Sequence, residues 1–117
     1  MSGAAPVIAW QPDAPADFRT RVPEDWRGEV VRLLVALKRE PRLGDLLEVD
    51  PRVGDLSDCR KLEFGPDEGR GPTFRIVYRL LPDSLAPAQV EIVAIGPKQE
   101  LLAYALAASR LGRHPPG

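Results

Sequence analysis

One stretch of the chain, between Pro23 and Pro41, repeats apolar residues every three to four positions. This period is that of an amphipathic α-helix. Glu24 and Asp25 suit the positive end of the helix dipole, and Pro41 enforces a stop. We predict a helix over residues 24–40, and its broad apolar stripe indicates that it packs against a sheet. The stripe consists of Trp26, Val30, Val31, Leu33, Leu34, Val35 and Leu37.

Three later runs, 58–64, 73–81 and 89–95, are rich in β-branched and aromatic residues, as strands are. The segments 65–72 and 82–88 that join them carry the glycines and prolines typical of loops. Consecutive strands joined by such loops usually pair antiparallel. The pattern therefore predicts a three-stranded antiparallel meander.

The two ends of the chain supply the remaining elements. Residues 7–10 have strand propensity and predict a short first strand. Residues 98–111 repeat apolar positions at helical spacing after the corner at Gly96-Pro97, and they predict a final helix. Residues 14–22 are ambiguous, although a short helix capped by Asp13 is one interpretation.

Together these elements predict an α+β fold. A small antiparallel sheet, made of the short N-terminal strand and the meander, carries helices 24–40 and 98–111. The chain has 117 residues, 44% of them hydrophobic, which suits one folded domain over residues 1–117. Residues 1–6 and 112–117 are expected to be flexible tails.

Charge restricts the ways in which the chain could contact nucleic acid. The formal net charge is −1, whereas proteins that bind nucleic acid non-specifically usually carry a large basic excess. A local cluster of cations, or a larger partner that supplies most of the docking, would therefore have to make such a contact.

Few residues suit metal or redox chemistry. Cys59 is the single cysteine, so an internal disulfide is excluded and a buried thiol is expected. The single histidine, His114, lies among prolines near the C-terminus, and we expect no metal site and no cofactor. The sequence contains no apolar run long enough to cross a membrane and no signal peptide, which favours the cytoplasm.

Basic side chains gather on one predicted face of the meander. Alternate residues of a strand share a face, so Arg75 and Arg79 lie opposite the apolar residues of their strand. On the strand before, Lys61 and Glu63 share a face. Lys98 follows the last strand and can reach the same rim, while Tyr104 lies on the final helix.

Two interpretations of this cluster stay open on the residues alone. The cations can grip a phosphate and stabilise charge that develops on it. Alternatively, they are ordinary charges of a solvated sheet face, with Glu63 and Glu91 as cross-strand partners. Composition and spacing alone favour the second interpretation.

Three segments in order resemble the RelE/ParE toxin superfamily. They are Asp55-Leu56-Ser57-Asp58-Cys59-Arg60-Lys61-Leu62, then Phe74-Arg75-Ile76-Val77-Tyr78-Arg79, then Ile95-Gly96-Pro97-Lys98 with Tyr104 beyond. The resemblance covers residues 55–111, about half of the chain, and it shifts the balance toward the phosphate interpretation. It implies the toxin of a type II toxin–antitoxin pair.

In the RNA-cleaving branch of that superfamily, the matching residues have assigned roles. The resemblance implies that Arg75 holds the scissile phosphate, that Lys98 stabilises the transition state and that Lys61 acts in acid/base catalysis. Tyr104 would stack on a base or assist proton transfer. The implied reaction is metal-free cleavage of mRNA on the ribosome, with Arg60 and Arg79 as further RNA contacts.

Two residues depart from that pattern. Glu63 stands where a second base is usual, and Lys98 stands where arginine is more usual. Other relatives bind DNA gyrase instead, and some have no known activity. A gyrase-binding toxin and an inactive toxin-like binding module therefore remain alternatives. In each case the resemblance implies a cognate antitoxin protein as partner.

Overall fold

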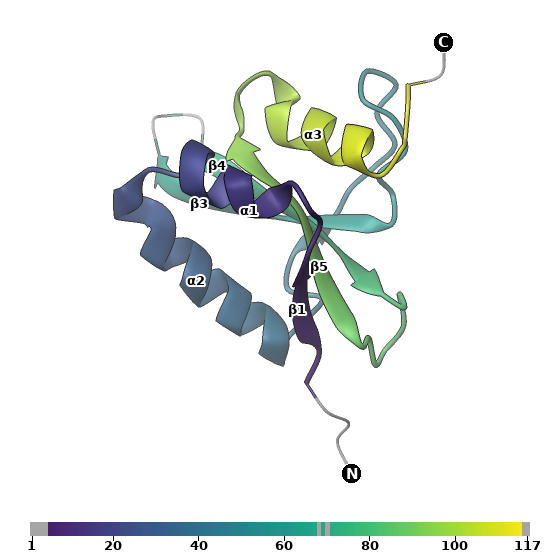
Figure 1. Ribbon diagram of the computed structural model, residues 1–117. Helices are drawn as coiled ribbons and strands as arrows, with labels where there is room; N and C mark the ends of the chain where they lie inside the picture. The colour runs from purple at the N-terminus through teal and green to yellow at the C-terminus, as the bar shows by residue number, and fades with distance from the viewer. Residues whose placement is uncertain (1–4, 68, 70, 116–117) are drawn as a thin grey trace.

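A five-stranded sheet forms the centre of the computed structural model, which describes residues 5–67, 69 and 71–115. The strand order is β1-β5-β4-β3-β2, and helices lie on both sides of the sheet (Figure 1). The strands are β1 (Val7–Trp10), β2 (Asp45–Leu46), β3 (Cys59–Asp67), β4 (Pro72–Leu81) and β5 (Gln89–Pro97). The helices are α1 (Ala14–Arg21), α2 (Glu24–Arg39), the 3-10 turn η1 (Gln99–Leu101) and α3 (Leu102–Arg110).

The predicted α+β class and the antiparallel meander β3-β4-β5 are confirmed. The sheet as a whole is mixed, however, because β1 runs parallel to β5. A strand that returns to a sheet in parallel needs a long crossover, and here α1, α2 and strands β2, β3 and β4 lie between β1 and β5 in the chain. The two-residue strand β2 pairs with β3 at the other edge.

The helices follow the predicted positions with differences at their ends. Helix α2 confirms the prediction over 24–40, with Pro23 at the cap position. The ambiguous segment forms α1, but Asp13 makes no side-chain cap hydrogen bond there. The final helix starts later than residue 98, because Glu100 and Leu101 both have a φ of 57° and separate η1 from α3.

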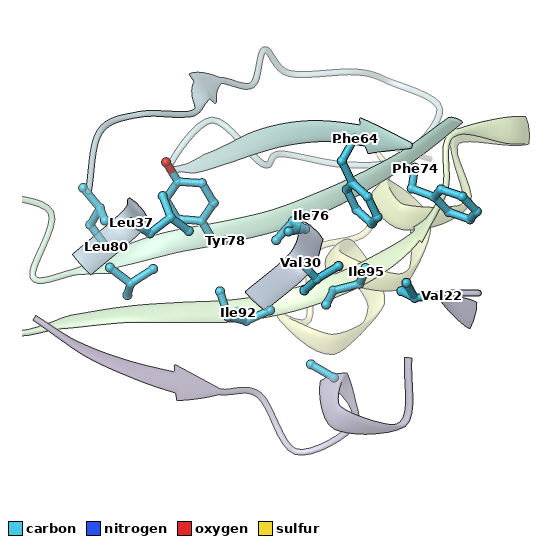
Figure 2. Packing of buried hydrophobic residues seen from close by; sticks show 12 residues of the cluster. Val22, Val30, Leu37, Phe64, Phe74, Ile76, Tyr78, Leu80, Ile92 and Ile95 are labelled. Atoms are coloured by element: carbon cyan, nitrogen blue, oxygen red, sulfur yellow. The ribbon is translucent and has the colours of Figure 1, made fainter. Parts of the chain in front are cut away.

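Two hydrophobic clusters cover the two faces of the sheet. On one face, Val30 and Leu37 of α2 pack on Ile76 and Tyr78 of β4, as Figure 2 shows. On the other face, the small residues of α3 pack on Val77 and neighbouring residues of β5. The alternation of β4 side chains is therefore as predicted, with α2 on one face and α3 on the other.

The apolar stripe of α2 is only partly covered. Val31 and Val35 remain 52% and 50% exposed. Trp26 and Leu34, by contrast, pack at the edge of the core. The sequence correctly identified the stripe but overestimated how much of it the sheet covers.

The hydroxyl of Tyr78 fastens the segment after α2 to the sheet. It donates to the Pro41 carbonyl and accepts from the Gly44 amide, both at 2.8 Å. Burial raises the pKa of Tyr78, so the hydroxyl stays protonated. A Cβ at residue 44 would lie 2.6 Å from the Lys61 carbonyl oxygen, which explains the glycine there.

Tyr78→Phe is expected to lower the free energy of unfolding by about 1–3 kcal/mol, because two backbone groups lose their buried partner. Urea unfolding should show a lower midpoint with an unchanged slope. Leu85→Ala is the control, since Leu85 is 95% exposed and its loss should change stability by less than about 0.5 kcal/mol. Equal midpoints for Tyr78→Phe and wild type would contradict the role of the hydroxyl.

Candidate phosphate-binding site

The carboxylate of Glu63 lies at the centre of the predicted basic cluster. It contacts Lys61 Nζ at 3.2 Å, Arg75 Nε at 3.2 Å and Lys98 Nζ at 3.3 Å. The sheet register explains this convergence. Glu63 on β3 lies directly opposite Arg75 on β4, and the Lys98 amide bonds the Thr73 carbonyl near the start of β4 at 2.8 Å. Three cations thus surround one carboxylate, which leaves the cluster positively charged.

Arg75 is the most enclosed member of the cluster. Only 8% of the residue is exposed, and its guanidinium lies 4.3 Å from the centre of the Tyr104 ring. This stacking on an aromatic face is a cation–π contact. Among the described residues, no hydrogen-bond partner faces its buried Nη1 atom. Buried donors are almost always satisfied, so the unused donor favours an acceptor that the described residues do not supply.

The electrostatics of the site keep Glu63 ionised. Partial burial raises the pKa of Glu63, but the hydrogen bonds from Lys61, Lys98 and Arg75 outweigh this effect, so the pKa lies below its usual value. Burial also raises the pKa of Tyr104, although the nearby Arg75 opposes this shift. At neutral pH the site therefore holds an ionised carboxylate and a neutral phenol.

Glu63→Gln is expected to reduce stability at neutral pH by about 1–2 kcal/mol, because three cations lose their shared anion. Because the pKa of Glu63 is lower in the folded state than in the unfolded state, the ionised carboxylate stabilises the fold. This contribution is complete above the unfolded-state pKa of about 4.3 and is lost as the pH falls through the folded-state pKa. The difference in melting temperature between wild type and variant should therefore shrink from pH 7 to pH 3.5. Glu48→Gln, at an exposed position, is the control, and a difference that grows in acid would contradict this account.

The structure brings Lys61, Arg75, Lys98 and Tyr104 together, as expected from the sequence, but not the two further arginines. Arg60 lies on the α2 side of β3 and donates to the Gly44 carbonyl at 2.9 Å. Arg79 shares the face of Arg75 but lies about 13 Å along β4.

Both cross-strand partners expected under the solvated-face interpretation are also present. Glu91 accepts from Arg79 at 2.7 Å, and Glu63 accepts from Arg75. Burial distinguishes the two pairs, because Arg75 is enclosed and Arg79 is only half-buried. Arg75 is therefore not an ordinary charge of a solvated sheet face, since Tyr104 of α3 covers it.

A groove of about 690 Å³ adjoins the cluster. The segment 46–54 and Leu56 form most of its walls, and Lys61 and Tyr104 belong both to the groove and to the cluster. No helix or strand was predicted in the connection formed by residues 42–57, so this groove was missed. Two exposed apolar residues within the connection, Leu46 and Val49, were the available signal.

Beside Lys98, on the side of the β3–β4 loop, a second hollow of about 540 Å³ is lined by residues 71–73 and 97–100. The cluster therefore has open space next to two of its cations, Lys61 and Lys98. Such an arrangement suits a chain-like ligand that extends beyond a bound phosphate in both directions.

Metal ligands do not gather in the described part of the chain, where no group of three His, Cys, Asp or Glu side chains could hold an ion. Cys59 is buried as expected, and burial raises the pKa of its thiol to about 12. None of the described helices combines the length and apolar character needed to cross a membrane.

The C-terminal segment is partly anchored. Arg113, within the tail expected to be flexible, donates to both carboxylate oxygens of Asp58 at 2.7 and 2.9 Å. The other expected tail, 1–6, falls mainly outside the described residues, as do Pro116 and Gly117.

Solved structures similar to this chain include RelE toxins. An E. coli RelE mutant in the free state matches with a TM-score of 0.65 and 19% identity, over 92% of this chain and 98% of that one. The isolated E. coli RelE toxin gives a TM-score of 0.59 at 19% identity, over 92% and 99% of the two chains. The RelBE2 toxin–antitoxin complex from Mycobacterium tuberculosis gives 0.58 at 21% identity, over 80% and 99%. The chain therefore has the RelE toxin fold, and the predicted resemblance is confirmed at the level of the fold.

Comparisons of sequence alone add little. No protein-family profile matches the chain. A translation initiation factor IF-2 from Solibacter usitatus is 34% identical over 71 residues, which cover 52% of this chain and 7% of that protein. This chain thus spans a small fraction of the length of that relative.

Proposed function

We propose that the protein is the toxin of a type II toxin–antitoxin pair and acts as a metal-free, ribosome-dependent mRNA endoribonuclease in the cytoplasm. The observation that carries the proposal is the convergence of Lys61, Arg75, Lys98 and Tyr104 on one RelE-fold face, with an unused buried donor on Arg75. A phosphate supplies the acceptor oxygens that such a site lacks.

Binding would begin with exchange of one anion for another. A phosphate that approaches Arg75 and Lys98 competes with the Glu63 carboxylate for the same donors. Because the Nη1 atom of Arg75 is enclosed, a neighbouring side chain has to shift before the phosphate reaches it. Loss of two cationic partners then raises the pKa of Glu63 toward its usual value.

The reaction that follows needs no cofactor. The RNA 2′-oxygen attacks the adjacent phosphorus, the bond to the 5′-oxygen breaks, and a cyclic 2′,3′-phosphate and a 5′-hydroxyl form. Glu63, once displaced, can accept the proton of the 2′-hydroxyl, and the Lys61 ammonium can donate a proton to the leaving 5′-oxygen. Arg75 and Lys98 stabilise the charge that develops on the phosphate.

The low net charge of −1 agrees with a ribosome-dependent reaction, because docking on the ribosome would replace the affinity that a basic protein obtains from RNA alone. The toxin would act on mRNA already held in the decoding site. The site then needs only a local cluster of cations.

Induced expression followed by mapping of mRNA ends tests the proposal. Growth arrest with stalled translation and newly cut mRNA supports the endoribonuclease. Arrest with DNA breaks and an SOS response supports a gyrase-binding toxin instead. Absence of any growth defect from folded protein would favour an inactive binding module.

A cognate antitoxin is the partner that this proposal implies, and one of the similar solved structures is a toxin–antitoxin complex. Helix α2 offers a surface for it. Val31, Val35 and Leu43 line an apolar groove of about 510 Å³ on its outer side, with Arg32 and Arg39 alongside. An amphipathic segment with acidic residues would suit this groove. Isolation of the protein with the product of an adjacent short reading frame would test the pairing.

A further inference from the structure

We propose that the Glu63 carboxylate is an autoinhibitory group, which closes the phosphate-binding cluster to free RNA and yields only to a phosphodiester that docking holds beside the site. This inference rests on the function proposed above and adds the regulation of the same site. It would make the dependence on the ribosome a property of the cluster itself.

The Glu63 carboxylate resembles a phosphodiester in the contacts that it makes. Its Oε2 atom accepts from Arg75 Nε at 3.2 Å and lies 3.3 Å from Lys98 Nζ, while its Oε1 atom lies 3.2 Å from Lys61 Nζ. A phosphodiester also presents two oxygens that share one negative charge, and arginine and lysine bind both kinds of anion. The carboxylate therefore fills the place that the three cations offer to a phosphate.

The groups that face Glu63 come from four parts of the fold. Lys61 of β3, Arg75 of β4 and Lys98 after β5 are the cations, and the neutral phenol of Tyr104 on α3 lies against Arg75. The same cations are the ones assigned above to the phosphate and to the leaving oxygen. One carboxylate therefore competes for all the charged groups that the reaction would use.

The carboxylate can leave Arg75 and Lys98 without becoming isolated. Glu63 and Lys61 lie two positions apart on β3 and so share one face, and Lys61 lines the open groove beside residues 46–54. The side chain of Glu63 is 23% exposed, whereas that of Arg75 is 10% exposed. Glu63 can therefore yield two cations to a phosphate and keep Lys61 as its partner, which makes the exchange reversible.

Glu63 has an advantage over RNA in free solution because it belongs to the same chain. A tethered group competes at an effective concentration on the order of millimolar, whereas free RNA competes only at its bulk concentration. The net charge of −1 adds little attraction for RNA. A phosphodiester that docking holds beside the cluster also has a high effective concentration, so it can displace the carboxylate. The site would thus distinguish docked RNA from free RNA.

Binding of dimethyl phosphate to the full chain tests the inference, because this small phosphodiester keeps one negative charge over the pH range used. NMR shifts of the Arg75 Nε–H group and of the Lys98 amide follow the binding. Glu63→Gln is expected to bind dimethyl phosphate about tenfold more tightly than wild type at pH 7, since the charged competitor is gone. A short RNA with a 2′-deoxy nucleotide that blocks cleavage should show the same order of affinities.

Glu91→Gln is the matched control, since Glu91 pairs with Arg79 on the same face of the sheet. Its loss changes the net charge by the same amount but leaves the cluster intact. Arg79 lies about 13 Å from Arg75 along β4, and charges at that distance are largely screened. The affinity of Glu91→Gln should therefore equal that of wild type. A melt of each variant shows that it is folded.

Acid should remove the advantage of Glu63→Gln. Hydrogen bonds from the cations hold the pKa of Glu63 below its usual value in the free chain, and the loss of two of them to a phosphodiester raises that pKa. Wild type therefore takes up a proton on binding when the pH lies between these two pKa values, and its affinity rises as the pH falls below about 4.3. The ratio of the two affinities should shrink from pH 7 to pH 3.5.

Two results would overturn the inference and leave the proposed function intact. One is equal affinity of wild type and Glu63→Gln for dimethyl phosphate at pH 7, with shifts at Arg75 and Lys98 in both. The other is the same gain in Glu91→Gln as in Glu63→Gln, which would show an effect of net charge alone. If dimethyl phosphate shifts neither Arg75 nor Lys98 in any of the three proteins, phosphate binding by the cluster fails as well, and both proposals fall together.

Discussion

Arg75→Ala is expected to slow mRNA cleavage by about 10²–10³-fold, the usual effect of removing one donor that stabilises a transition state. The guanidinium is fixed by Glu63 at 3.2 Å and by the Tyr104 ring at 4.3 Å. The guanidinium is therefore already held in place, and a phosphate has to replace only its carboxylate partner. Mapping of mRNA ends and growth after induction measure the loss.

Arg75→Lys should recover only part of the activity. A lysine retains the charge but lacks the planar fork that binds two phosphate oxygens, and it loses the flat stacking on Tyr104. The order wild type, Arg75→Lys, Arg75→Ala is therefore expected in both cleavage and toxicity. Equal activity of Arg75→Ala and wild type would remove Arg75 from the reaction.

Loss of stability must be separated from loss of function, because Arg75 is buried and its removal costs packing as well as charge. Tyr78→Phe serves as the control. It is expected to lose about 1–3 kcal/mol through a residue on the opposite face of β4. If Tyr78→Phe remains toxic and Arg75→Ala, equally stable, does not, the arginine acts in the site. If both lose toxicity together, Arg75 is structural.

The faces of the meander were predictable from the sequence because the rule behind them is local. Side chains alternate along a strand, so Phe74 and Ile76 could be placed opposite Arg75 without knowledge of the rest. The pairing of Glu63 with Arg75 follows from the register of two adjacent strands. Lys98 was placed at the rim because it ends the neighbouring strand.

Features that depend on distant segments were not predictable in this way. The parallel pairing of β1 with β5 joins residues about 80 positions apart, such as Ile8 and Val90. No local pattern specifies such a pairing. The burial of Arg75 was missed for the same reason, since it depends on where α3 places Tyr104.

The sequence predicted which residues make up the cluster, but it did not predict that Glu63 lies at the centre of the cluster. Alternation showed that Lys61 and Glu63 share a face, and Glu63 was treated as a departure from the superfamily pattern. In the structure, Glu63 is the residue that three cations contact. The ion pairs around it depend on side-chain reach across three segments, which sequence spacing alone does not determine.

The buried ion pair between Asp17 and Arg110 could not be predicted from sequence spacing either. Its loss is expected to cost more free energy of unfolding than the loss of the contacts around Glu63. Arg110 of α3 donates to both carboxylate oxygens of Asp17 in α1, at 2.5 and 2.8 Å, and to the Val93 carbonyl at 2.9 Å. Asp17 also accepts from the Ile95 amide at 3.0 Å. Only 2% of Asp17 is exposed. The pair therefore joins α1, α3 and β5 in the interior.

Asp17→Asn is expected to lower the free energy of unfolding by about 3–5 kcal/mol, the usual cost of leaving one charge of a buried pair without its partner. This is a large part of the 5–15 kcal/mol typical of small domains. The Arg110 guanidinium, 10% exposed at its side chain, cannot turn into water without disturbing the end of α3. Urea unfolding measures the effect: the midpoint should fall while the slope stays unchanged.

Arg21→Ala is the matched control, because Arg21 also contacts Asp17, at 3.3 Å, but its side chain is 38% exposed. Its loss should cost less than about 1 kcal/mol. In the double variant Asp17→Leu with Arg110→Met, neither charge remains buried, and stability should recover relative to Asp17→Asn. Full recovery is not expected, since the Ile95 amide still lacks an acceptor. A loss below about 1 kcal/mol for Asp17→Asn would show that α1 and α3 are held by apolar packing and that the ion pair contributes little.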